Sequence, residues 1–113
     1  MSDKTNPLEI KALEIKVLIG KAMRYRIKKE STLENCEASI DTHLACTIET
    51  AMTNKLALAR SKGRGGWWRD DVTVSQLKVM LLEHIEKGDM LDVVNLAAMI
   101  YVKEAMEINT NEQ

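Results

Sequence analysis

Apolar residues recur every three or four positions along most of the chain, which is the spacing of amphipathic helices. The first such segment follows the sequence Asn-Pro-Leu-Glu at residues 6–9, where Asn can cap a helix, Pro suits its first turn and Glu can reach back to the cap. We expect a helix from there to about Lys29. Residues 14–19 alternate in polarity and are partly β-branched, so a short strand there is an alternative.

A second helix is predicted from a capping box of Ser31 and Glu34, in which each side chain satisfies a backbone N–H group of the first turn. Apolar residues continue at helical spacing from Leu33 to Leu58, with charged residues between them. The helix is expected to end near Arg60, where Gly63 is available to terminate it.

Two further helices are predicted after residue 72. Thr73 and Gln76 form another capping-box pair, and Gly88 is suited to end the helix that they begin. Asp89 then precedes a fourth segment, residues 90–108, which is apolar nearly all round and is therefore expected to be buried on several sides. The pattern leaves open whether the third and fourth helices are continuous through Gly88.

Together these segments predict an all-α fold: a bundle of about four helices, with the fourth at its centre and a Gly/Trp/Arg-rich loop between the second and third. At 113 residues we expect one domain over residues 1–113, because two separate cores would each be marginal. The polar ends, residues 1–5 and 109–113, are expected to be disordered.

Composition narrows the classes of function. The formal net charge is −1, from 16 basic and 17 acidic residues, which argues against attraction of nucleic acid over the whole surface. No apolar run is long enough for a membrane span or a signal peptide. Cys36 and Cys46 lie on one predicted helix, too far apart for a disulfide, so both are expected as reduced thiols. We therefore expect a cytoplasmic protein.

The strongest functional signal is the loop from Arg60 to Arg69, which contains both tryptophans of the chain. Glycine lets a backbone approach a ligand, arginine and lysine bind phosphate, and tryptophan offers a face on which a base can stack. The same residues could instead form turns, fill one end of the bundle or complement a helix terminus. For a ligand site, the candidates in this loop are Arg60, Lys62, Arg64, Gly65, Gly66, Trp67, Trp68 and Arg69.

Polar residues in the last two predicted helices extend this candidate site. Asp92 and Asn95 lie on one face of an otherwise apolar helix, and buried groups of this kind need polar partners. His84 and the loop arginines can supply those partners and so tie the loop down. In a ligand site, His84, Asp92 and Asn95 would instead line the pocket, with Asp92 and Asn95 reading the polar edge of the ligand.

Residues 63–101 combine a Gly-Gly-Trp loop, a helix, Lys-Gly-Asp and Asp-Val-x-Asn. This segment resembles small accessory proteins of tailed bacteriophages and enterobacterial prophages. The resemblance implies a phage accessory protein in the cytoplasm of a bacterial host, and it brings no activity with it. Phage proteins of this size often act by stoichiometric binding, either blocking a host protein or sequestering a nucleotide signal of host defence.

A shorter segment, residues 86–97, is similar to the second metal-binding helix of the MazG-type nucleotide pyrophosphohydrolases, where an E-x-x-D pair lies in a G-D-x-L-x-x-x-V-N sequence. Those enzymes pair it with an earlier E-x-x-E helix, and Glu34 and Glu37 have that spacing. Under this alternative the protein is an enzyme, in which Glu34, Glu37, Glu86 and Asp89 hold Mg²⁺ against a triphosphate.

We predict instead a non-catalytic binder of a nucleotide-like, phosphorylated small molecule, with no cofactor, resident metal or catalytic residue. Arg64 and Arg69 would hold the phosphate, and Trp67 or Trp68 would stack the base. The other leading interpretation is a helical interaction module or inhibitor of a host protein, anchored by exposed tryptophans. In either form we expect a homo-oligomer, because the Met-rich helices offer more apolar surface than so small a bundle needs. Neither a membrane nor nucleic acid is an expected partner.

Overall fold

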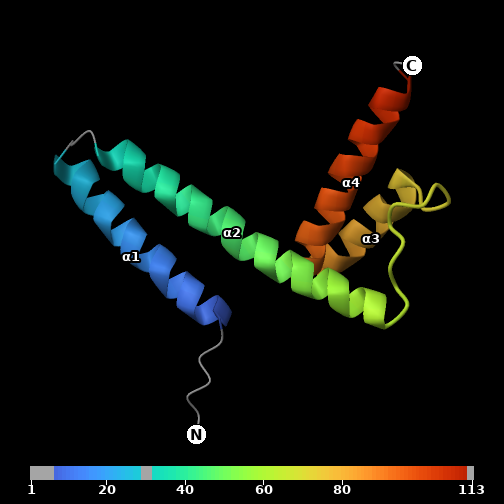
Figure 1. Cartoon of the computed structure of the whole chain (residues 1–113), viewed down its shortest axis with the longest axis horizontal. Helices are drawn as coiled ribbons and strands as arrows, with labels where there is room; N and C mark the ends of the chain where they lie inside the picture. Colours follow the sequence, from blue (N-terminus) through green and yellow to red (C-terminus); the bar gives the residue numbers. More distant parts are fainter. Residues whose placement is uncertain (1–6, 29–31, 112–113) are drawn as a thin grey trace, which may run out of the picture. The chain divides into compact units, whose positions relative to one another are not determined.

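The computed structural model describes residues 7–28 and 32–111, and the side chains of residues 9–24 and 33–107. Over these residues the chain forms four helices and no strand: α1 (Pro7–Lys28), α2 (Thr32–Ser61), α3 (Val74–Lys87) and α4 (Met90–Asn111) (Figure 1). The predicted all-α class with four helices is confirmed. Residues 14–19 are helical, so the strand alternative is wrong.

The chain divides into two compact units, which we call the N-terminal unit (Met1–Ala51) and the C-terminal unit (Met52–Gln113). The boundary between these units falls inside α2, and one domain over residues 1–113 stays a prediction. Helix α4 continues to Asn111, so the C-terminal segment predicted to be disordered is helical up to that residue. Residues 1–5, also predicted to be disordered, lie outside the described residues.

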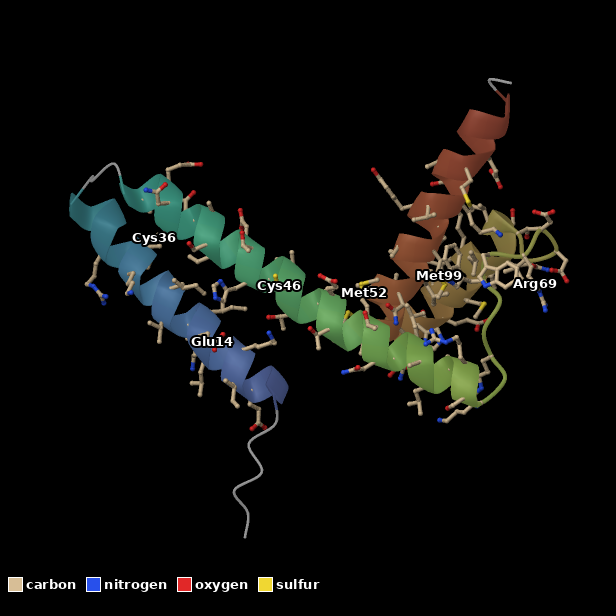
Figure 2. All side chains as sticks on the ribbon, viewed as in Figure 1. Glu14, Cys36, Cys46, Met52, Arg69 and Met99 are labelled. Atoms are coloured by element: carbon tan, nitrogen blue, oxygen red, sulfur yellow. The ribbon has the colours of Figure 1, made fainter. Side chains whose placement is uncertain are left out.

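The N-terminal unit consists of α1 and the first part of α2. Its buried side chains include Ala22 and Thr47. Cys36 and Cys46 both lie on α2 as free thiols (Figure 2). The capping box predicted at Ser31 falls on a residue outside the described part of the chain.

The core of the C-terminal unit lies between α3 and α4, which pack against each other. Leu77 of α3 and Leu96 and Ile100 of α4 are its most buried apolar side chains, exposed by only 2%, 5% and 7%. Val72 and Val74, at the start of α3, pack against this cluster. The first core residue of α3 is therefore held next to the end of the preceding loop.

Both ends of α3 have the capping features that its sequence predicts. The Gln76 backbone N–H donates to Thr73 Oγ1 at 3.2 Å, and the Thr73 N–H donates to Gln76 Oε1 at 2.9 Å, which completes the capping box. Gly88 has a φ of 77°, and its N–H donates to the carbonyls of His84 and Ile85. Residues other than glycine rarely adopt this left-handed backbone conformation, which interrupts the helix. Gly88 therefore separates α3 from α4, and the two helices are not continuous.

Helix α4 buries its deepest side chains along one face, while its first half is partly buried all round, since residues 91–96 are all buried or half-buried. Its buried positions, Asn95, Leu96, Ile100 and Lys103, recur at helical spacing, as one face of a helix requires. Tyr101 lies on the opposite face and is 77% exposed. The expected burial on several sides is thus present in the first half of α4 but not over residues 101–107, where Lys103 is buried and the other residues are exposed.

Replacing Thr73 with alanine is expected to lower the free energy of unfolding by about 0.5–2 kcal/mol, because the Gln76 N–H loses its acceptor at the N-terminus of α3. Thermal or urea denaturation followed by circular dichroism measures the change. Ser75→Ala is the matched control, since Ser75 is exposed on the first turn of the same helix and should stay within about 0.5 kcal/mol. Equal losses for the two variants would show that the capping box contributes nothing specific.

Candidate ligand-binding site

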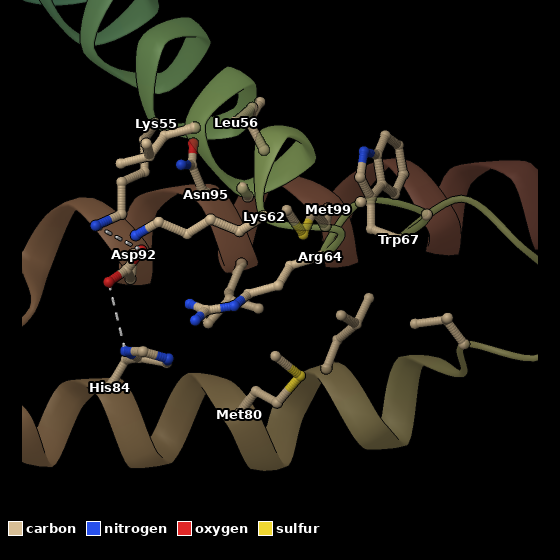
Figure 3. A pocket seen from close by; sticks show the side chains of 17 residues that line it. Lys55, Leu56, Lys62, Arg64, Trp67, Met80, His84, Asp92, Asn95 and Met99 are labelled. Atoms are coloured by element: carbon tan, nitrogen blue, oxygen red, sulfur yellow. Dashed lines mark ion pairs between the residues drawn. The ribbon is translucent and has the colours of Figure 1, made fainter.

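The C-terminal unit contains a pocket of about 450 Å³ between the end of α2, the following loop and the facing sides of α3 and α4 (Figure 3). Known small-molecule sites range from about 300 to 1,000 Å³, so the size suits a small ligand. Leu77, Met80, Leu96 and Met99 give the pocket an apolar wall that is continuous with the core. Its polar groups come from the loop and from the charged ends of the helices.

The turn that ends α2 places two cations at the pocket. Gly63 has a φ of 77°, its N–H donates to the Arg60 carbonyl at 3.0 Å, and the Arg64 N–H donates to the Ala59 carbonyl at 2.8 Å. This pair of bonds is a Schellman motif, which reverses the chain direction at a helix end. The side chains on either side of Gly63, Lys62 and Arg64, both extend into the pocket (Figure 3).

Lys62 and Arg64 have no carboxylate partner in the described part of the chain. The ion pairs of that part involve Lys55, Arg69, Lys78 and His84 instead. Both side chains are exposed, so an anion that enters the pocket can reach either of them. A phosphate or carboxylate group of a ligand is the chemistry that fits them.

The acidic group of the pocket, Asp92, is already engaged by neighbouring side chains. Asp92 Oδ1 lies 3.6 Å from Lys55 Nζ, and Asp92 Oδ2 lies 3.6 Å from His84 Nδ1. The same His84 nitrogen lies 3.3 Å from Asp89 Oδ2. This chain of contacts links α2, α3 and α4 at one end of the pocket, so Asp92 and His84 hold the wall together as well as line it.

Asn95 is the most unusual polar residue of the pocket. Its side chain lines the pocket from α4 yet is only 4% exposed. Within the described residues, Asn95 Oδ1 is buried and has no hydrogen-bond partner. Leaving a buried acceptor unsatisfied costs about 1–3 kcal/mol. A ligand group that donates a hydrogen bond to it would recover that cost.

A buried lysine holds the loop that carries Trp67. Lys103 of α4 is 6% exposed, and its Nζ donates to the carbonyl oxygens of Trp67 at 3.1 Å and Arg69 at 2.9 Å. These two bonds tie the loop to α4 and fix the backbone of Trp67, whose side chain lines the pocket at the end away from His84 and Asp92 (Figure 3). Lys103 therefore determines where the aromatic end of the pocket lies.

The structure gathers most of the predicted site residues but not all of them. The predicted residues that line the pocket are Lys62, Arg64, Gly65, Gly66, Trp67, His84, Asp92 and Asn95. Three others do not line it: Arg60, Trp68 and Arg69. Trp68 is 62% exposed, and Arg69 Nε lies 3.3 Å from Asp71 Oδ1. Of the two tryptophans Trp67 lines the pocket, and of the three arginines Arg64 does.

Sequence reasoning missed Lys55 and Lys103. Lys55 belongs to the predicted second helix, but nothing in the pattern marked which of its residues lie near α4. Lys103 had a usable signal, because it follows Leu96 and Ile100 at helical spacing and so belongs to the buried face of α4. A lysine on such a face needs oxygen partners, and the carbonyls of the preceding loop are the ones it has.

The enzyme alternative draws its four carboxylates from both units of the chain. Glu34 and Glu37 belong to the N-terminal unit, whereas Glu86 and Asp89 belong to the C-terminal unit. The group of potential metal ligands found in the described part of the chain is instead His84, Asp89 and Asp92, whose ligand atoms lie within 4.8 Å of one another. The Lys55 ammonium beside Asp92 opposes a cation there.

Comparison with known proteins adds no family assignment, since no protein-family model, curated protein or solved structure matches the chain. The resemblances to phage accessory proteins and to pyrophosphohydrolases remain predictions. None of the helices in the described ranges is long and apolar enough to cross a membrane.

Proposed function

We propose that the C-terminal unit binds a nucleotide-like, phosphorylated small molecule in this pocket. The observation that carries the proposal is the pair of cations, Lys62 and Arg64, which extend into a partly apolar pocket without a carboxylate partner among the described residues. Hydrogen bonds from guanidinium to phosphate are charge-assisted and roughly twice as strong as those between neutral groups. The anionic group of the ligand belongs between these two side chains.

The apolar part of the pocket supports a flat, largely apolar moiety on the same ligand. Trp67 is partly buried and lines the pocket together with Met99 and Leu96. Stacking of a base on an aromatic side chain contributes about 1–3 kcal/mol. A phosphate alone would leave this wall uncovered, whereas a nucleotide would cover both the cationic and the aromatic regions.

Binding without turnover is the form of the proposal that these contacts favour. Asp92 contacts Lys55 and His84, and Asp89 contacts His84, so both carboxylates already have polar partners within the protein. The resemblance to phage accessory proteins adds a role for such binding, which is to sequester a nucleotide signal of host defence. A ligand recovered unchanged after incubation with the protein is the expected result.

Replacing Arg64 with alanine is expected to weaken nucleotide binding by about 10- to 100-fold, since charge-assisted hydrogen bonds contribute about 1.5–3 kcal/mol each. Isothermal titration calorimetry and thermal shift measure the loss, and the wild-type protein should gain about 2.7 kcal/mol of stability at a hundredfold excess of ligand over the dissociation constant. Arg69→Ala is the matched control, because Arg69 belongs to the same loop but pairs with Asp71 and does not line the pocket.

Equal effects of the two arginine substitutions would contradict this placement of the phosphate. Circular dichroism should show unchanged helical content in both variants, because neither side chain contributes to the core cluster. If no nucleotide of a broad panel stabilises the wild-type protein, the proposed function fails.

A second candidate function, recognition of a partner protein, is favoured by one specific observation. Trp68 is 62% exposed and is followed by Arg69, an exposed pair of the residue types enriched at interface hot spots. The absence of any nucleotide response, with capture of a partner that Trp68→Ala abolishes, would favour this function over ligand binding.

A further inference from the structure

We propose that Asn95 selects the base of the bound nucleotide, and that the pocket prefers a purine with an amino group at position 6, as in adenine, over one with a keto group there. This inference rests on the proposed function and makes it more specific. It concerns which nucleotide binds, whereas the cations Lys62 and Arg64 concern only the phosphate that every nucleotide shares.

The Asn95 side chain has a buried oxygen that lacks a donor in the described part of the chain. Asn95 Oδ1 is buried without a hydrogen-bond partner within the described residues, and the side chain as a whole is 96% buried. A carboxamide oxygen accepts hydrogen bonds and cannot donate one. The group that completes this site must therefore present an N–H or O–H donor, and a second acceptor in that position would be repelled.

The surroundings of Asn95 strengthen this requirement. Leu96 is its neighbour in sequence, and Met99 lies one helical turn further along α4, so the wall beside the amide is apolar. Lys55 lies beside Asn95 (Figure 3), but its ammonium group is directed to Asp92, at 3.6 Å. Because no described residue donates to Oδ1, a mismatched ligand leaves both its own acceptor and Oδ1 unsatisfied.

The amide can reach a ligand without a change in the backbone. Asn95 lines the pocket, and the terminal torsion of an asparagine side chain has a broad range of accessible angles. Rotation about both side-chain torsions can turn the amide edge, with its oxygen and its nitrogen, toward the pocket. The side chain then offers one acceptor and one donor next to each other, in a plane.

This donor and acceptor pair matches the edge of adenine. Asparagine forms a bidentate pair with adenine by accepting from the N6 amino group and donating to N7. Guanine and hypoxanthine carry an oxygen at position 6, which would face Asn95 Oδ1 with a second acceptor. A purine also covers more of an aromatic face such as Trp67 than a single ring does, so the 6-aminopurine nucleotides are the class that fits.

The test compares adenosine 5′-monophosphate with inosine 5′-monophosphate, which differ in the group at position 6, by calorimetric titration of the full chain. The expected result is that the adenosine nucleotide binds about 5- to 100-fold more tightly, the range set by one bidentate pair. Ribose 5-phosphate, which has no base, should bind more weakly than either.

Asn95→Leu is the variant that assigns the preference to this residue. Leucine is close to asparagine in size and leaves no unsatisfied acceptor in an apolar wall, so the variant should fold with unchanged helical circular dichroism. Its affinity for the adenosine nucleotide should fall to that for the inosine nucleotide. A preference that survives in Asn95→Leu would overturn the role of Asn95.

The remaining outcomes separate this inference from the proposed function. Equal affinities of the wild-type protein for the two nucleotides would overturn the base preference and leave nucleotide binding in place. If neither nucleotide binds, and no other nucleotide stabilises the protein, both proposals are wrong.

Discussion

Replacing Leu77 with alanine is expected to lower the free energy of unfolding of the C-terminal unit by about 2–5 kcal/mol, the largest effect predicted for any single substitution in this chain. Leu77 is 2% exposed and belongs to the cluster that includes Leu96 and Ile100. Shortening it removes apolar contacts and leaves a cavity where α3 meets α4. With so few buried side chains in this core, the surrounding residues can compensate little of that loss.

Urea denaturation followed by circular dichroism measures this change, and Leu82→Ala provides the control. Leu82 lies on the same helix and undergoes the same chemical change, but it is 63% exposed. Its substitution should stay within about 0.5 kcal/mol of the wild-type value. Similar decreases in the free energy of unfolding for the two variants would mean that Leu77 is not buried between α3 and α4.

Replacing Lys103 with methionine should lower the free energy of unfolding by about 2 kcal/mol and weaken ligand binding as well. The substitution removes two charge-assisted hydrogen bonds, to the carbonyls of Trp67 and Arg69, each of which contributes about 1.5–3 kcal/mol. The substitution also removes the free-energy cost of burying the Lys103 ammonium group. That gain offsets part of the loss, so the net destabilisation is smaller than the sum of the two hydrogen bonds. Methionine retains the length and apolar stem of the side chain.

In this variant, protection from hydrogen exchange should fall more in the loop than in the helices. Freed from α4, the backbone of Trp67 no longer fixes the aromatic end of the pocket, so nucleotide affinity and protection of the loop from hydrogen exchange should both fall. Lys78→Met is the control, because Lys78 Nζ lies 3.6 Å from Glu104 Oε2 in an exposed pair, which contributes about 0–1 kcal/mol. Unchanged exchange in Lys103→Met would show that the loop keeps its position without the lysine.

The helices could be predicted from the sequence because their signals are local. The capping box of Thr73 and Gln76 and the left-handed Gly88 depend on residues a few positions apart, and the structure contains both where the sequence placed them. The same is true of Gly63 at the end of α2. A helix end needs only its own turn to be satisfied, so neighbouring residues are sufficient to predict it.

The site was harder to predict because it depends on contacts between distant segments. Trp67 and Trp68 are adjacent and identical in chemistry, and the backbone that orients them is held by two hydrogen bonds from Lys103, more than thirty residues away. Lys55 became part of the site through Asp92, a residue of another helix. The loop composition identified the region of the pocket, whereas the residues that complete it come from the packing of α4.

The turn at Gly63 also limits which sequence changes relatives of this protein can accept near the pocket. Lys62 and Arg64 are separated by the glycine that ends α2, so the residue that stops the helix also sets the spacing of the two cations. An insertion or deletion between Ala59 and Arg64 would change both at once, and few such changes could be inherited without loss of the pocket. The exposed loop positions around Asp70 have no such double role, and relatives that keep the pocket should vary there first.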